Sequence, residues 1–209
     1  FKLKEKYMFH FYQMLFFTPI RMGFPAKFIG KENIPEGACI IASNHVSNLD
    51  AILLALHTWE KKFYLSKKEL FKNKISASFY KSLGCIKIDR EKSDINAVKS
   101  CLKVLKDGKK LVIFPEGTRH NNEDMELGEV KHGVAMFATK ARVPIVPMFV
   151  QKKPKLFRRT KFFIGKPFEL TEFYGKKMTS EELEQASGVV ANKMNELREY
   201  ALNSLTKKK

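Results

Sequence analysis

Short apolar runs alternate with longer amphipathic segments along this chain, and this alternation predicts its secondary structure. A short apolar run bounded by turn residues is typical of a buried strand, whereas apolar residues spaced three and four apart are typical of a helix. By these patterns we predict strands at 37–42, 62–65, 86–90, 110–114, 143–150 and 161–168. Helices are predicted at 51–56, 69–82, 95–105, 131–141 and 179–201.

The order of these elements predicts the fold class. Strands that alternate with helices form βαβ units, so we expect a single α/β domain with a mixed, mostly parallel sheet flanked by helices. The run 143–150 contains two prolines, which lack the N–H that a central strand donates. We therefore expect an edge or irregular position for that strand.

Capping residues mark the ends of two predicted helices. Ser93 or Asp94 can cap the first of these helices, and Gly108 supplies its stop. Its apolar stripe consists of Ile95, Val98, Leu102 and Leu105. Thr179 and Glu182 form a capping box at the start of the last helix. The stripe of that helix consists of Leu183, Val190, Met194, Leu197 and Ala201.

One turn between a predicted strand and a predicted helix contains residues suited to catalysis. Ser47 is the predicted N-cap of the helix, with Asp50 at the third helical position. His45 precedes this cap at the C-terminal end of a strand, where the ligand sites of α/β folds collect. There His45 can act as a general base, with Asp50 accepting the second ring N–H. The alternative is that Asp50 only caps the helix and His45 is a polar loop residue.

A second group of polar residues follows the strand at 110–114. Pro115 ends that strand and places the next four residues on a loop. The backbone N–H of Gly117, the hydroxyl of Thr118 and the guanidinium of Arg119 come together there. Such a group suits a phosphate, because arginine offers paired donors and glycine lets the backbone approach. A surface turn without a ligand is the alternative.

The net charge of +17 restricts the possible partners. It attracts nucleic acid, anionic lipid or an acidic protein. No recognition helix or RNA-binding signature is present, so nucleic acid is not expected. Cys39, Cys85 and Cys101 lie in apolar segments without CxxC spacing, which argues against a disulfide framework or a zinc site. We expect a reducing compartment and neither a metal nor a cofactor.

Residues 7–20 are unusually aromatic and have basic residues on both sides. A helix that spans a bilayer needs about 20 apolar residues, and this run is shorter and interrupted by His10, Gln13 and Pro19. We predict an amphipathic helix at the membrane interface. The alternative is a helix packed on the protein's own core. No small-residue cleavage site follows, so a signal peptide is not expected.

Several blocks of sequence, taken together, resemble a known family. His45-x-x-x-x-Asp50 resembles the first motif of the glycerolipid acyltransferases, the PlsC-type 1-acylglycerol-3-phosphate acyltransferases. The segments 84–90, 114–119 and 143–147 are similar to the second, third and fourth motifs, in the same order. Lys67 and Lys131 fall where the family usually has lysines. The segment 73–78 departs from the family, which usually has a proline and an aromatic residue there.

The resemblance implies an activity and roles for the site residues. Family members move an acyl group from acyl-CoA or acyl-acyl carrier protein to the sn-2 hydroxyl of 1-acylglycerol 3-phosphate (lysophosphatidic acid), giving phosphatidic acid. By analogy, His45 deprotonates the hydroxyl and Asp50 orients the imidazole. The residues expected to bind or shape the site for the acceptor phosphate are Lys67, Arg90, Glu116, Gly117, Thr118 and Arg119.

The resemblance also implies an organisation and leaves alternatives open. We expect a membrane-associating segment at 1–27 and an acyltransferase domain at 28–209. The protein would be peripheral or monotopic on the cytoplasmic face of an anionic membrane. One alternative is acyl transfer to glycerol 3-phosphate or another lysolipid. Another is a non-enzymatic basic protein that binds lipid or nucleic acid, in which the histidine and aspartate are structural.

Overall fold

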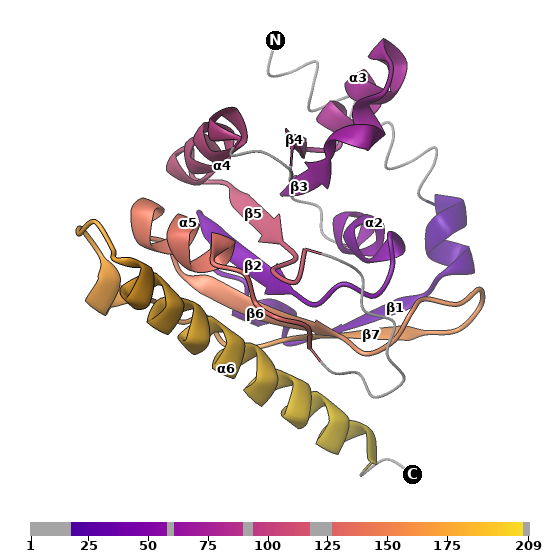
Figure 1. Ribbon diagram of the computed structural model, residues 1–209. Helices are drawn as coiled ribbons and strands as arrows, with labels where there is room; N and C mark the ends of the chain where they lie inside the picture. The colour runs from indigo at the N-terminus through magenta and orange to yellow at the C-terminus, as the bar shows by residue number, and fades with distance from the viewer. Residues whose placement is uncertain (1–17, 58–60, 90–93, 118–126, 207–209) are drawn as a thin grey trace.

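A computed structural model describes residues 18–57, 61–89, 94–117 and 127–206 (Figure 1). These residues form a seven-stranded sheet in the order β1-β7-β6-β2-β5-β3-β4. Neighbouring strands are parallel except for β6 and β7, which are antiparallel. The strands are β1 (Ala26–Ile29), β2 (Cys39–Ser43), β3 (Phe63–Lys67), β4 (Cys85–Ile88), β5 (Lys110–Ile113), β6 (Ile145–Val150) and β7 (Thr160–Ile164). The predicted mixed, mostly parallel sheet is confirmed, and β1 is a strand that the sequence pattern missed.

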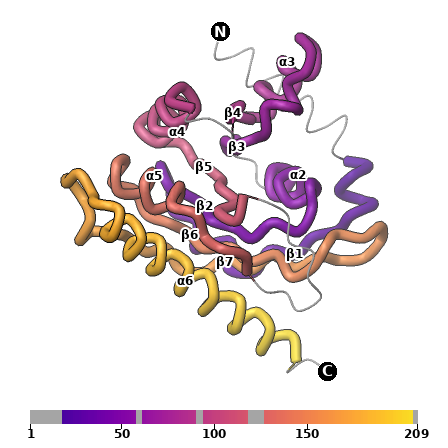
Figure 2. Tube along the Cα trace, in the orientation of Figure 1, coloured from indigo at the N-terminus to yellow at the C-terminus, as the bar shows by residue number. Residues whose placement is uncertain are grey.

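Helices cover both faces of the sheet (Figure 1). They are α2 (Leu49–Leu56), α3 (Lys74–Ser82), α4 (Ile95–Lys106), α5 (Gly133–Ala141) and α6 (Ser180–Thr206), with 3-10 turns η1 (Lys31–Asn33), η2 (Lys68–Phe71) and η3 (Thr171–Phe173). Residues 18–23 are also helical. The long α6 runs past β6 and β7 (Figure 2). No helix in the described part of the chain is both long and apolar enough to cross a membrane.

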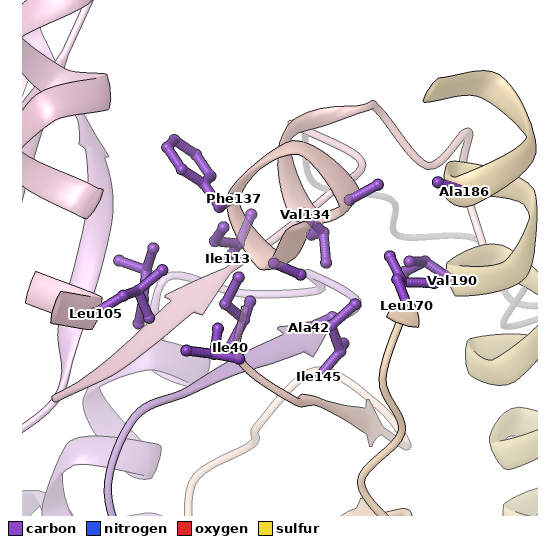
Figure 3. Close-up of a cluster of buried hydrophobic side chains, with 14 of the residues drawn as sticks. Ile40, Ala42, Leu105, Ile113, Val134, Phe137, Ile145, Leu170, Ala186 and Val190 are labelled. Carbon is purple, nitrogen blue, oxygen red and sulfur yellow. The ribbon is translucent and has the colours of Figure 1, made fainter. Parts of the chain in front are cut away.

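The fully buried β2 contributes to the core on both sides of the sheet. Ile40 and Ala42 pack with α4, α5 and α6 on one face (Figure 3). Cys39 and Ile41, the alternate residues, pack with α2 on the other face. A strand covered on both sides reads as a continuous apolar run, because neither set of side chains meets water. Because β2 lies between β6 and β5, the turn that follows β2 lies between the ends of these two strands.

The position of β6 corrects the expectation of an edge strand. It lies inside the sheet, between β7 and β2. Pro147 is nevertheless tolerated at an irregular position, because the facing chain has a bulge there. Two residues separate Ile145 from Met148 in β6, whereas three separate their partners Phe168 and Ile164. Irregular pairing is where a sheet accepts a residue without an N–H.

Most of the predicted helix starts are confirmed. Asp94 caps α4 by accepting a hydrogen bond from the Ala97 N–H, and Thr179 and Glu182 form the capping box of α6. The predicted helix at 69–82 is divided into η2 and α3, and α3 begins at its own capping box on Asn73. Ile95, predicted to face the core, is exposed. It is the first residue of α4, and the burial of this helix begins with Ala97 instead.

Candidate active site

The turn after β2 is built around the carboxylate of Asp50, which is fully buried. Its Oδ2 atom accepts hydrogen bonds from the backbone N–H groups of Val46 at 2.8 Å and Ser47 at 2.7 Å. The same oxygen lies 3.1 Å from Nδ1 of His45. A carboxylate can only accept, so Nδ1 carries a proton, and Nε2 is the basic nitrogen of the neutral ring. The predicted pairing of His45 with Asp50 is therefore present.

The capping box predicted here is only half formed. The N-cap is Asn48 rather than Ser47, and α2 begins at Leu49. Asp50 does reach back to the Ser47 N–H, but the Ser47 hydroxyl accepts from Leu49 instead of from Asp50. One oxygen of the carboxylate contacts three donors, and the helix starts one residue later than the predicted cap implied. Its role therefore combines closing the turn with holding the imidazole.

Phe114 packs against one face of the His45 imidazole. The rings of His45 and Phe114 are stacked, with centroids 4.1 Å apart and planes 24° apart. Phe114 directly follows β5, the strand beside β2. A hydrogen bond sets the direction of the histidine ring, and an aromatic contact limits its rotation. This contact joins the first predicted motif to the third.

The loop after Phe114 is held by residues that come much later in the chain. Buried Glu116 accepts a hydrogen bond from the Gly128 N–H at 3.2 Å. The Lys131 N–H donates to the Pro115 carbonyl at 3.1 Å. Gly117 has a φ of +68°, and a Cβ atom there would lie 3.2 Å from the Lys131 ammonium. The segment that ends at Lys131 thus folds back over the third motif and places a cation above Gly117.

One detail of the predicted phosphate site is corrected. The Gly117 N–H donates to the Phe114 carbonyl at 3.1 Å, which closes a tight turn. It is therefore not the free donor that the sequence suggested, and what Gly117 provides is a positive φ and space for the Lys131 side chain. Arg90, Thr118 and Arg119, the other predicted phosphate ligands, lie outside the described residues.

A cavity of about 880 Å³ lies beside His45. Lys67, at the end of β3, and Gly117 lie in its wall together with His45, so the cavity brings together three of the predicted site residues. The rest of the lining is mostly apolar. It includes Ala51 and Ile52 of α2, Leu65 of β3, Leu70 of η2, Phe79 of α3 and Leu83, which follows α3. A cavity with a polar end and an apolar body fits an amphiphilic ligand.

Three residues near the site were not assigned roles from the sequence. Phe114 stacks on His45, Asn44 joins the turn to Val150, and Tyr64 lines the cavity. The Tyr64 hydroxyl has no hydrogen-bond partner among the described residues. Burial raises the pKa of Tyr64 and that of the neighbouring Cys85 thiol, so both stay protonated at neutral pH. The available signal for Asn44 was its position next to the first motif, and that for Phe114 was its place as the first residue of the third motif, whereas Tyr64 had no such signal.

A histidine held by a buried carboxylate at the C-terminal edge of a parallel sheet is chemically able to act as a general base toward a hydroxyl. Sequence and structure comparisons agree with this chemistry. The family model described as Acyltransferase matches residues 25–151. The chain belongs to the acyltransferase family.

Individual relatives support the same assignment. The 1-acyl-sn-glycerol-3-phosphate acyltransferase of Bacillus subtilis (strain 168) is 34% identical over 154 residues, which cover 70% of this chain and 75% of that protein. The protein of the same name from Streptococcus pneumoniae (strain ATCC BAA-255 / R6) is 31% identical over 167 residues, covering 77% of this chain and 60% of that protein. The crystal structure of the 1-acyl-sn-glycerophosphate (LPA) acyltransferase PlsC from Thermotoga maritima matches with a TM-score of 0.64 and 25% identity, over 92% of this chain and 79% of that chain.

Proposed function

We propose that this acyltransferase moves a fatty acyl group from a thioester donor to the sn-2 hydroxyl of 1-acylglycerol 3-phosphate, giving phosphatidic acid. The observation that carries the proposal is the His45 Nδ1 to Asp50 Oδ2 contact of 3.1 Å in the wall of the cavity of about 880 Å³. The activity in the names of the similar proteins supports the choice of acceptor.

In the proposed reaction each residue of the pair has its own role. Nε2 of His45 takes the proton of the acceptor hydroxyl, and the oxygen attacks the thioester carbonyl. The carbon–sulfur bond then breaks, and the thiolate leaves with a proton returned by the imidazolium. Asp50 keeps Nδ1 protonated and stabilises the positive charge that forms on the ring. A positioned base of this kind accelerates a reaction by roughly 100 to 10,000-fold.

The cavity wall supports a division of the substrates. Its apolar residues suit acyl chains, and the end of the cavity at Lys67 suits the acceptor phosphate. In the proposal Lys67 and Lys131 contribute charge at that end, with Arg90, Thr118 and Arg119 of the second and third motifs completing the phosphate site. Glu116 and Gly117 shape it by holding the loop over the cavity.

Further parts of the proposal concern the donor and the location. The donor is acyl-CoA or acyl-acyl carrier protein, and both present the same thioester to His45. The protein acts as a peripheral or monotopic enzyme on the cytoplasmic face of an anionic membrane. The membrane-associating segment proposed at 1–27 is the part of that range before β1, which begins at Ala26, and the acyltransferase domain proposed at 28–209 then includes the whole of β1. The net charge of +17 supports attraction to such a surface.

Turnover of purified protein tests the acceptor assignment. We expect acyl transfer to 1-acylglycerol 3-phosphate to be faster than to glycerol 3-phosphate or to lysolipids with a larger headgroup. Arg119→Lys keeps the charge but loses the planar fork, so it should raise the acceptor KM more than the donor KM. Faster turnover of another acceptor would contradict the substrate, and equal changes in both KM values would contradict the role of Arg119.

A further inference from the structure

The connection between β6 and β7, which we name the 151–159 hairpin, contains a basic group that the proposed reaction does not use. It has no acidic residue, and its five cationic side chains are all exposed; they are Lys152, Lys153, Lys155, Arg158 and Arg159. None of the five forms an ion pair with a described residue. Their charge is therefore directed to solvent or to a partner.

Two large apolar side chains protrude from the tip of the same hairpin. Phe157 is 77% exposed and Leu156 is 57% exposed. Phe157 has a φ of +54°, which is unusual for a residue with a side chain. The backbone is fixed there, because the Phe157 N–H donates to the Gly23 carbonyl at 2.6 Å and the Arg158 N–H donates to the Lys155 carbonyl at 3.1 Å. The exposure of Phe157 is thus imposed by a defined turn.

A third exposed apolar residue lies beside this tip. Met22, 74% exposed, directly precedes Gly23 in the helical segment 18–23. A Cβ atom at Gly23 would lie 3.1 Å from Leu156, so the hairpin packs closely on this segment. Figure 1 shows the two side by side, as an orange loop and an indigo helix at one end of the molecule. In the sequence, Met22 and Gly23 closely follow residues 7–20, the aromatic run that is predicted to associate with a membrane.

The hairpin is joined to the active site. The Asn44 side chain, next to His45 in sequence, accepts from the Val150 N–H at 2.7 Å and donates to the Val150 carbonyl at 3.1 Å. Lys153 lies in the wall of the same cavity as His45, and Ile20 of the helical segment lies there too. A surface that contacts this hairpin would therefore lie next to the cavity.

We propose that the 151–159 hairpin is a membrane-insertion element that seats the active-site cavity on an anionic bilayer. Phe157 and Leu156 enter the boundary between headgroups and acyl chains, while the flanking cations bind lipid phosphates. Protruding apolar residues with long basic neighbours are typical of an interfacial anchor, because the basic side chains reach back to the charged layer. This inference rests on the proposed function and deepens it by naming how a lipid acceptor reaches His45.

Lipid quenching measures the insertion directly and does not depend on activity. Trp59, the single tryptophan, is first replaced by Phe, and Phe157→Trp then places a reporter at the tip. Vesicles of phosphatidylcholine with anionic phosphatidylglycerol, brominated on the acyl chains, should quench this reporter. Tyr200→Trp is the control, because Tyr200 is an exposed aromatic residue on α6. Absence of quenching at position 157 in vesicle-bound protein would overturn the proposal.

Vesicle sedimentation measures the contribution to binding. Leu156→Ser with Phe157→Ser should weaken binding to the same vesicles roughly ten- to hundredfold. Ile95→Ser is the matched control, because Ile95 is 63% exposed on α4 at the other side of the sheet, and it should leave binding unchanged. Changing Lys155, Arg158 and Arg159 to Gln should weaken binding by a similar factor at low salt and less at high salt. Equal effects of the hairpin and the control variants would contradict the proposal.

Kinetics separate a membrane surface from an acidic protein partner and from a failure of the proposed function. The Leu156→Ser, Phe157→Ser enzyme should keep its turnover of a short-chain, water-soluble acceptor and lose turnover of a vesicle-embedded acceptor. If vesicle binding is unchanged and the KM for an acidic carrier-protein donor rises, the hairpin is a protein-docking surface and the proposal is wrong. If the unaltered enzyme acylates neither acceptor but inserts the hairpin, the proposed function fails and the membrane element stands.

Discussion

The two loops that meet at the candidate active site are built in different ways. Both follow parallel neighbouring strands, β2 and β5, at the same edge of the sheet. In the turn after β2, Asp50 bonds groups that lie only three to five residues earlier. In the loop after β5, Glu116 bonds Gly128, twelve residues away, and Lys131 covers Gly117. The proposed catalytic pair is thus arranged by a local turn, whereas the predicted phosphate loop is held by a segment that comes later in the chain.

His45→Ala should have the largest effect, because it removes the base from the local turn. We expect turnover to fall roughly 100 to 10,000-fold. The free energy of unfolding should fall by only about 1 kcal/mol, since the ring loses its stacking on Phe114 while the Asp50 hydrogen bonds to backbone remain. Steady-state kinetics and a melting curve on one preparation check both values. A turnover near that of the unaltered enzyme would remove His45 from the mechanism.

Substitutions of Asp50 separate its two roles, which are to accept the backbone hydrogen bonds of the turn and to hold the His45 ring. Asp50→Ala leaves the buried N–H groups of Val46 and Ser47 without an acceptor, and should lower the free energy of unfolding by about 3 kcal/mol. Asp50→Asn can keep one oxygen toward those donors, so its loss of stability should be about half as large. Both should lose most of the activity, because neither stabilises the imidazolium.

Denaturant unfolding and turnover of the two Asp50 variants provide the check. An Asn variant that is fully active would show that the carboxylate is needed for the turn alone. An Ala variant with unchanged stability would show that water replaces the lost acceptor.

Gly117→Ala tests whether the second loop depends on Lys131. An alanine is strained at the positive φ of +68°, so the substitution should lower the free energy of unfolding by about 1 to 2 kcal/mol. The added methyl group should also displace the Lys131 ammonium and raise the acceptor KM severalfold, with the donor KM unchanged. Gly108→Ala is the matched control, since Gly108 has a φ of +74° and open space around its Cβ position. Equal KM values for the two variants would argue against a role of Lys131 at the phosphate end.

Tyr64→Phe should have the smallest effect, because Tyr64 belongs to neither loop although it lines the same cavity. Its hydroxyl has no partner among the described residues, so its removal should leave the free energy of unfolding within about 1 kcal/mol. Turnover should be unchanged, since the Tyr64 hydroxyl forms no hydrogen bond with His45 or with any other described residue. Thermal melting and the standard assay measure both, and a larger loss of stability would reveal a bound water or ligand group on the hydroxyl.

Part of the fold could be predicted because it depends on short-range patterns. The buried strand β2, the cap of α4 at Asp94 and the capping box of α6 are properties of a few consecutive residues. The position of β6 could not be predicted in this way. Its proline excludes a regular ladder, but the bulge that accommodates Pro147 lies in the chain near Gly165, and only the packed sheet brings the two together.

The same physical distinction applies to the site. The sequence by itself determined the family motifs and brought His45 and Asp50 within one short turn, which made their pairing a testable prediction beside the alternative of a simple cap. The tertiary structure decided that Phe114 stacks on the imidazole, that Lys131 lies over Gly117, and that the 151–159 hairpin stands beside the cavity. These contacts join segments that the order of the strands and the packing of the helices bring together. Local sequence patterns do not specify which distant segments will meet.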